Sequence, residues 1–289
     1  MIIVNLKGGL GNQMFQYAAG KALATKTQQE LKIDITSLTR ANEIGNIYRP
    51  FSLDRFTLSA PLATDSEIQK LKPAQNILTK VYRKIVYKLQ GDRTVCFDEA
   101  FMQLTGEQYL EGYWQSPRYF ENIREDILCE FALKESDSSY NEQSKNKMQQ
   151  GDSVSMHIRR GDYIKNPTVA KEFGQCSTEY YQKAIAHVTK HTTNPRFFIF
   201  SDDIEWVKEN LQLPTSTVFV SDPSLTDTEE LVLMSKCAHH IIANSSFSWW
   251  AAWLNQNPAK IVIAPTPWFD NLRYDAHLIP DTWTLLPKQ

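Results

Sequence analysis

The chain has 289 residues, with 31 basic and 33 acidic side chains, a formal net charge of −2 and a hydrophobic fraction of 42%. This length accommodates one large or two medium domains, and the apolar fraction is typical of an ordinary globular core. The balanced charge excludes a global polyanion-binding surface, so nucleic acid is not an expected partner and any anionic ligand should be small.

Residues 1–6 form a short apolar run with no basic segment before it, so they predict a strand rather than a signal peptide. No window approaches the roughly 18 apolar residues of a membrane span, so we expect at most peripheral contact with a membrane, at its inner face. The cysteines Cys96, Cys129, Cys176 and Cys237 show no zinc pattern, and Cys129 and Cys237 are expected to be buried thiols. This cysteine usage favours a reduced cytoplasm.

The chain begins with the pattern strand, glycine-rich loop, helix, over residues 2–6, 7–13 and 14–25. That arrangement places a ligand at a helix N-terminus. A dinucleotide fingerprint would need glycine where Met14 stands, and the P-loop pattern is absent too. The loop is therefore either a ligand-approach loop of another kind or a tight turn. A second strand follows at 31–35.

Between about residues 40 and 130 the pattern is weak. Helices are predicted at 67–71, 77–89 and 120–131, and a strand at 108–110. The loop after that strand, Gly112 to Ser116, carries aromatic and amide side chains. Those side chains fit two interpretations, stacking on a sugar or packing beneath the loop.

A polar segment at 134–152 is the best candidate for a domain boundary, and it predicts domains at 1–150 and 151–289. Beyond it strands and helices alternate, which predicts an α/β sheet with helices on both faces. The expected strands are 153–158, 197–200, 217–220, 239–243 and 260–264, and the expected helices are 178–191, 205–211, 226–237 and 247–254. No element is predicted in the tail, which is rich in proline and tryptophan.

Two adjacent arginines, Arg159 and Arg160, follow the buried strand predicted at 153–158, which contains His157. Like charges side by side repel each other unless an anion lies between them, and arginine is well shaped to bind a phosphate with two hydrogen bonds. Gly161 allows the backbone to turn, and Asp162 places a carboxylate near the same point. A solvated surface turn with an Arg–Asp pair is the other interpretation of this loop.

Two further loops are predicted at the same edge, because the loops that follow parallel strands share an edge and bind ligands there. Asp202 and Asp203 follow one strand, where they could accept hydrogen bonds from a ribose or a guanine, or bind a metal. Asp203 alternatively caps the next helix. Ser245 and Ser246 begin another helix, where hydroxyls and backbone N–H groups can hold phosphate oxygens, and Phe247 lies at its mouth.

Four segments, in this order, resemble the bacterial α-1,2-fucosyltransferases. They are GGLGNQMFQYA at 8–18, HIRRGDY at 157–163, FIFSDD at 198–203 and NSSFSWWAAWL at 244–254. The similarity covers nearly the whole chain. It implies a GT-B-like α/β fold of two facing Rossmann-like domains with parallel sheets, the first on the acceptor side and the second binding GDP-fucose.

The resemblance also implies an activity. Such enzymes transfer L-fucose from GDP-fucose to the 2-hydroxyl of a terminal galactose, with inversion and without a metal or other cofactor. Arg159 would hold the β-phosphate and neutralise the departing GDP. His157 and one of Asp202 and Asp203 would contact the nucleoside, and Asp162 would be the base or would orient Arg159.

The remaining residues that the resemblance assigns belong to the motifs at 8–18, 157–163 and 244–254. Asn12 would face the reaction centre from the first domain. The other donor-binding residues would be Arg160, Ser245, Ser246, Phe247, Gly11 and Gln13. The acceptor would be a galactose-terminated glycan, whether a lipid-linked O-antigen or capsule repeat or a free oligosaccharide.

Three rival hypotheses stay open from the sequence. One is a nucleotide-sugar-binding protein without catalysis, and another is a transferase of the same fold with a different donor or acceptor. The third is a metal-dependent transferase that uses Asp202 and Asp203, although this pair lacks the intervening residue of an Asp-x-Asp motif. Full activity in EDTA would exclude the third.

Overall fold

The computed structural model describes residues 1–40, 49–73, 95, 97–134, 146–161, 164, 170–171, 173–270 and 277–289. The chain divides into two compact units, Met1–Lys134 with Ala276–Ile279, and Glu135–Asp275 with Pro280–Gln289. The predicted helix at 77–89 and much of the polar segment at 134–152 lie outside the described residues, so the boundary at residue 150 stays a prediction. No helix in the described parts is both long and apolar enough to cross a membrane.

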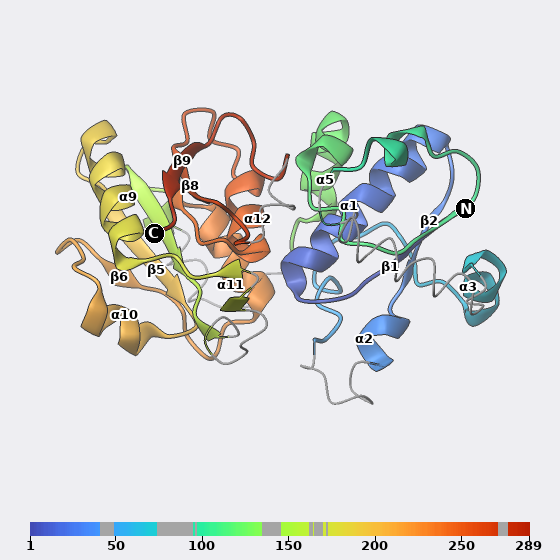
Figure 1. Ribbon diagram of the computed structural model, residues 1–289, viewed down its shortest axis with the longest axis horizontal. Coiled ribbons are helices and arrows are strands. Elements are labelled where there is room, and N and C mark those ends of the chain that lie inside the picture. Colours follow the sequence, from blue (N-terminus) through green and yellow to red (C-terminus); the bar gives the residue numbers. More distant parts are fainter. Residues whose placement is uncertain are drawn as a thin grey trace. The chain divides into compact units, whose positions relative to one another are not determined.

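The first unit contains a three-stranded parallel sheet in the order β2-β1-β3, of which Figure 1 labels β1 and β2. Its strands are β1 (Ile2–Asn5), β2 (Leu31–Asp34) and β3 (Gln108–Leu110). All four residues of β1 are buried, as expected for a central parallel strand. The predicted order of strand, loop and helix is correct. The helix α1 spans Leu10–Thr27, so it begins four residues earlier than predicted, and residues 10–13 belong to the helix rather than to the loop.

Short helices complete the described part of the first unit. They are α2 (Thr36–Arg40), α3 (Asp65–Leu71), η2 (Glu99–Gln103), η3 (Pro117–Tyr119), η4 (Glu121–Ile123) and α5 (Arg124–Glu130). The helix predicted at 120–131 is thus a 3₁₀ turn followed by two turns of α-helix. The expectation that Cys129 is buried is wrong, because Ile127 and Glu130 take the inward face of α5 and leave Cys129 exposed.

A buried carboxylate, that of Glu130, ties α5 to α1. It accepts hydrogen bonds from the Tyr17 hydroxyl at 2.7 Å, from the Lys21 ammonium at 2.6 Å and from the backbone N–H of Ser59 at 2.6 Å. Burial alone would raise the pKa of this carboxyl, but the hydrogen bonds from Lys21, Ser59 and Tyr17 outweigh it and lower the pKa. The ionised form therefore stabilises the first unit.

The second unit contains a six-stranded parallel sheet in the order β6-β5-β4-β7-β8-β9. The strands are β4 (Ser153–Ile158), β5 (Arg196–Ser201), β6 (Val218–Phe219), β7 (His239–Ile241), β8 (Val262–Thr266) and β9 (Thr284–Pro287). Every residue of β4, a central strand, is buried. Its residues alternate between apolar side chains (Val154, Met156 and Ile158) and polar ones, and the buried hydroxyls of Ser153 and Ser155 are hydrogen-bonded.

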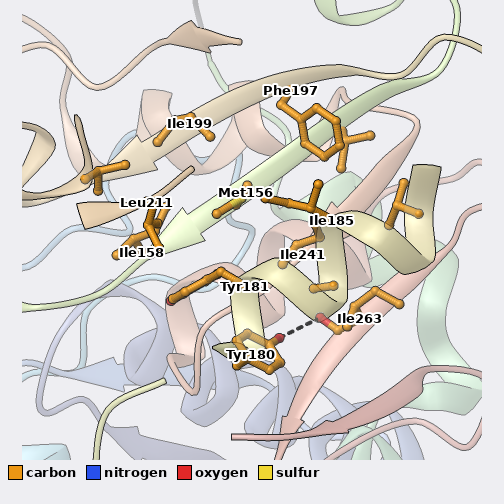
Figure 2. Close-up of a cluster of buried hydrophobic side chains, with 14 residues drawn as sticks. Met156, Ile158, Tyr180, Tyr181, Ile185, Phe197, Ile199, Leu211, Ile241 and Ile263 are labelled. Atoms are coloured by element: carbon orange, nitrogen blue, oxygen red, sulfur yellow. Dashed lines mark hydrogen bonds between the residues drawn. The ribbon is translucent and has the colours of Figure 1, made fainter. Parts of the chain in front are cut away.

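Four described helices belong to this unit: α9 (Thr178–His191), α10 (Ile204–Asn210), α11 (Asp227–Ser235) and α12 (Ser246–Leu254). Met156 and Ile158 of β4 pack with Tyr181 and Ile185 of α9 in a cluster of buried side chains (Figure 2). The intervening His157 points to the opposite face, because side chains alternate along a strand, and it contacts α12 there. The prediction of helices on both faces is confirmed.

The sequence analysis missed the edge strand β9. It pairs in parallel with β8 (Figure 1), and its exposure alternates between half-buried and exposed residues. The next residue, Lys288, is buried, and its ammonium donates to the Asp270 carboxylate and to the Phe173 carbonyl, both at 2.6 Å. A strand of four residues that contains proline gives too weak a periodic pattern to be found.

Candidate functional site

The carboxyl ends of β4, β5 and β7 meet at one edge of the six-stranded sheet. Ile158 of β4 pairs with Ser201 of β5 in parallel register. Arg159 and Asp202 are therefore the first residues beyond two neighbouring strands and come to the same level. Ligands of open α/β sheets bind at this edge, so the sequence prediction that these loops come together is borne out in their geometry.

One carboxylate closes the arginine loop. Asp202 lies 2.8 Å from the Arg159 guanidinium and accepts hydrogen bonds from the backbone N–H of Arg160 at 2.9 Å and of Gly161 at 3.0 Å. A Cβ at position 161 would lie 2.6 Å from the same carboxylate, so only glycine permits this approach. Since three donors occupy Asp202, we assign it to holding the loop rather than to contacting a nucleoside.

The second arginine is held elsewhere. Its Nε lies 3.0 Å from the Asp203 carboxylate, and its guanidinium carbon lies 3.7 Å from the centre of the Trp206 ring. Asp203 also accepts from the backbone N–H of Trp206 at 3.3 Å, which makes it the N-cap of α10, as the alternative interpretation proposed. Arg159 and Arg160 thus face different carboxylates, and this arrangement relieves their mutual repulsion without an anion between them.

His157 is buried beside this loop, with 4% of its surface exposed. Burial, together with the charge of Arg159, lowers its pKa to about 3, so the ring is neutral at physiological pH. Its ring centre lies 5.5 Å from that of Phe247, and its Nδ1 atom has no hydrogen-bond partner within the described residues. An unpaired buried polar atom is costly, and it is expected where a ligand completes the site.

The N-terminus of α12 contributes a second positive element. Ser245 is the N-cap residue but makes no side-chain capping bond, and Ser246 and Phe247 are half-buried in the first turn. The first N–H groups of a helix have no partner within it, and they carry the positive end of the helix dipole. The N–H groups at this end of α12 can therefore donate hydrogen bonds to phosphate oxygens, as the sequence suggests.

Two residues of this region were not singled out by the sequence. Asn244 is fully buried, and its amide donates to the carbonyls of Phe173, Gly174 and Trp268 at 2.8, 3.2 and 3.1 Å. It therefore fixes the chain around the start of α12. Asparagine before a serine pair resembles an ordinary turn in sequence, which hid this role.

The other missed residue is Glu230 of α11. Its carboxylate accepts from the Ser221 hydroxyl, which in turn accepts from the backbone N–H of Ser201 at 2.9 Å. Burial raises the pKa of Glu230, and the nearby charge of Asp202 adds to the effect. In the sequence this segment indicates only a capping box, formed by Thr226 and Glu229. The hydrogen bonds through Ser221 show that Glu230 faces β5.

The site residues predicted in the first unit form a separate cluster. Gln13 is fully buried, and its amide bonds the carbonyls of Gly8 and Pro50, both at 2.9 Å, and the Ser52 N–H at 3.1 Å. We therefore assign Gln13 to shaping the loop. Gly11 is buried in the first turn of α1. Asn12 is half-buried, and its side-chain oxygen accepts from the Gln115 amide at 2.7 Å.

Asp162, the candidate base, lies outside the described residues. Elsewhere in the chain, within the residues that the structure describes, no three His, Cys, Asp or Glu side chains gather closely enough to hold a metal ion. The described part of this edge therefore offers Arg159, the N-terminus of α12 and the neutral His157 at the ends of the neighbouring strands β4 and β7. These groups suit a phosphorylated ligand with a largely uncharged remainder.

Known glycosyltransferases resemble this chain over nearly its whole length. The sequence model of glycosyl transferase family 11 matches residues 1–284. The chain is 32% identical to an α-1,2-colitosyltransferase of Escherichia coli, with 100% of this chain and 99% of that one covered. It is 31% identical to the E. coli O-antigen biosynthesis glycosyltransferase WbnK, over 96% and 98%. Identity to galactoside α-(1,2)-fucosyltransferase 2 of Gorilla gorilla gorilla is 24%, over 98% and 78%.

Solved structures show the same architecture. The chain resembles NodZ α-1,6-fucosyltransferase soaked with GDP-fucose, with a TM-score of 0.56, 15% sequence identity and 96% of each chain covered. At this identity the likeness shows the fold alone. The predicted GT-B-like α/β fold with parallel sheets is confirmed, and so is the resemblance to the α-1,2-fucosyltransferase family.

Proposed function

The chain belongs to glycosyl transferase family 11, and from this membership we propose that it transfers L-fucose from GDP-fucose to the 2-hydroxyl of a terminal galactose, with inversion. That it is a glycosyltransferase follows from the family and from its relatives. The choice of donor sugar, of acceptor hydroxyl and of stereochemistry is our proposal. The name of a relative over 98% of the chain, a galactoside α-(1,2)-fucosyltransferase, supports it.

In this reaction the acceptor oxygen forms a bond to C1 of fucose while the bond from C1 to the β-phosphate oxygen breaks. The electron pair of the broken bond leaves with GDP, and the acceptor hydroxyl loses its proton. Negative charge therefore develops on the β-phosphate in the transition state. A cation fixed beside that oxygen lowers the barrier, because it binds the transition state more tightly than the ground state.

Arg159 is the cation that we assign to this task. The observation that carries the proposal is its ion pair with Asp202, which holds the guanidinium at the carboxyl edge of the sheet. The backbone N–H groups at the start of α12 would bind the other phosphate oxygens, with Ser245, Ser246 and Phe247 around them. Neutral His157 would meet the nucleoside without adding a charge that competes for the phosphates.

We further propose that the reaction needs no metal. Arg159 and the α12 N-terminus already supply positive charge, which a bound cation supplies in metal-dependent transferases. Asp203, the N-cap of α10, is committed to Arg160 and to the helix. We propose Asp162 as the base that takes the acceptor proton, because the nearby Asp202 carboxylate already accepts hydrogen bonds from the backbone of this loop.

GDP-colitose is a second candidate donor. The relative with 32% identity is named a colitosyltransferase, and colitose differs from fucose by the loss of one ring hydroxyl. A site that hydrogen-bonds this hydroxyl would reject the deoxy sugar strongly, whereas a site without such a partner would accept both. The ratio of kcat/KM for the two GDP-sugars therefore decides which donor the chain uses.

The test is release of GDP from GDP-fucose in EDTA, with lactose, lacto-N-biose or N-acetyllactosamine and without acceptor. The proposal predicts release that depends on acceptor and is unaffected by EDTA. GDP binding without turnover in any arm would favour the non-catalytic binding protein. Turnover only with GDP-colitose would keep the fold and the reaction class but replace the donor.

A further inference from the structure

A cluster of polar and aromatic side chains lies in the first unit, away from the arginine loop in the chain. Val4 of β1 pairs with Leu110 of β3 in parallel register. Lys7 and Tyr113 are each the third residue beyond that pair, so the chain brings them to the same edge of the small sheet. The Lys7 ammonium lies 4.3 Å from the centre of the Tyr113 ring, which confirms the register at side-chain level.

An amide pair adjoins this contact. The Gln115 amide donates to the side-chain oxygen of Asn12 at 2.7 Å, and this bond fixes which way the Asn12 amide points. Gly8 has a φ of +78°, and a Cβ there would lie 2.8 Å from Nδ2 of Asn12. The backbone at Gly8 thus takes a conformation that favours glycine, and the absence of a side chain there leaves space for the Asn12 amide.

The loop that carries Tyr113 and Gln115 is strained at the residue between them. Trp114 has a φ of +53°, in the left-handed region that bulky residues avoid. Its ring is buried and packs 4.8 Å from that of Phe101, measured between centres. Such strain is unfavourable, and it concentrates where side chains must be held for a ligand. The packing interpretation therefore holds for Trp114 but leaves its two neighbours unexplained.

From these contacts we propose that Lys7, Asn12, Tyr113 and Gln115 form the subsite for the acceptor glycan, a neutral sugar bearing vicinal hydroxyls. This proposal rests on the proposed function, which requires such an acceptor. Amide groups both donate to and accept from hydroxyls, an ammonium donates to them, and a tyrosine ring packs against the C–H face of a sugar. These are the properties of a site for an uncharged, hydroxyl-rich ligand.

The same cluster is poorly suited to the diphosphate of the donor. It holds a single cation, Lys7, whose ammonium lies against an aromatic face, whereas the other unit offers Arg159 and the start of α12. The backbone at Lys7 is fixed independently, because the Gln16 amide bonds its N–H at 2.9 Å and its carbonyl at 3.2 Å. The Lys7 side chain can therefore be changed without releasing the loop.

The experiment compares Lys7→Met and Gln115→Leu with the wild-type chain, using Lys72→Met as the matched control. Lys72 lies 5.0 Å from the centre of the Tyr109 ring, in the same unit, but contacts Asp34 rather than Asn12. Binding of lactose is measured by saturation-transfer NMR, and KM is measured for lactose and for GDP-fucose. Circular dichroism melting shows that each variant is folded.

Loss of one hydrogen bond to a sugar hydroxyl should raise the lactose Kd and KM about fivefold to tenfold in each variant, with KM for GDP-fucose within about twofold of the wild type. The control should leave lactose binding unchanged. The proposal is overturned if lactose affinity is unchanged in Lys7→Met, or if Lys72→Met weakens it equally. Because lactose binding is measured without turnover, failure of fucosyl transfer in the wild type would refute the proposed function but not this subsite.

Discussion

Removal of the Asp202 carboxylate tests how the site holds its arginine. In Asp202→Ala the Arg159 guanidinium loses an ion pair of 2.8 Å, and two backbone N–H groups lose their acceptor. A fixed donor at a developing anion contributes about 3 to 4 kcal/mol to the transition state. If a loosened Arg159 forfeits about 2 to 3 kcal/mol of this, kcat/KM should fall about 30- to 160-fold. The fold should persist, because the carboxylate is partly exposed.

The assay is GDP release under subsaturating GDP-fucose with a saturating acceptor. Asp202→Asn keeps the size of the side chain but loses its charge, so it should fall in the same range as Asp202→Ala. Asp222→Ala is the control, because this carboxylate contacts Ser224 beyond β6 instead of the arginine loop. A kcat/KM within threefold of the wild type for folded Asp202→Ala would refute the inference that Asp202 positions Arg159.

Four further outcomes are expected. Arg159→Ala should stay folded without GDP but lose more than about 150-fold in kcat/KM. Near-normal turnover would show that Arg159 has no part in the mechanism. Gly161→Ala should reduce turnover about tenfold, because the added Cβ would displace the Asp202 carboxylate. Kinetics measure the loss of turnover, and the melting temperature shows whether the variant is folded. Because the folded-state pKa of Glu130 is lowered, Glu130→Gln should destabilise the chain by about 2 to 4 kcal/mol at pH 7, and urea unfolding should show that difference shrinking as pH falls below about 4.5. The His157 ring, with a pKa of about 3, should show no titration by NMR between pH 5 and 8, and a midpoint in that range would contradict its burial as a neutral group.

The regular elements of the second unit were predictable because their patterns are strong. The bounds predicted for β4 and α9 match those observed. Apolar residues recur at every second position of β4 and about every 3.6 residues along α9, which are the periods of a strand and of an amphipathic helix. The convergence of Arg159 and Asp202 also followed from topology alone, given parallel strands. β9 was missed because an edge strand of four residues, none of them fully buried, carries little periodicity.

The roles of single side chains were less predictable. The sequence shows that Asp202 follows a strand, but only the register reveals that its carboxylate meets two backbone N–H groups as well as Arg159. The sequence predicts Gln13 as a donor-binding residue, yet its amide is hydrogen-bonded to backbone groups of Pro50 and Ser52. Hydrogen bonds between distant segments depend on tertiary packing, which local patterns do not encode.

The central claim is that the chain moves fucose from GDP-fucose to the 2-hydroxyl of galactose. NMR analysis of the disaccharide or trisaccharide product tests it most directly, because through-bond correlations identify both the anomeric configuration and the linked carbon. The account predicts an α-linked fucose on C2 of the galactose, formed in EDTA and formed far more slowly by Arg159→Ala. A product linked at another carbon, a retained configuration at C1, or the same yield from Arg159→Ala would contradict it.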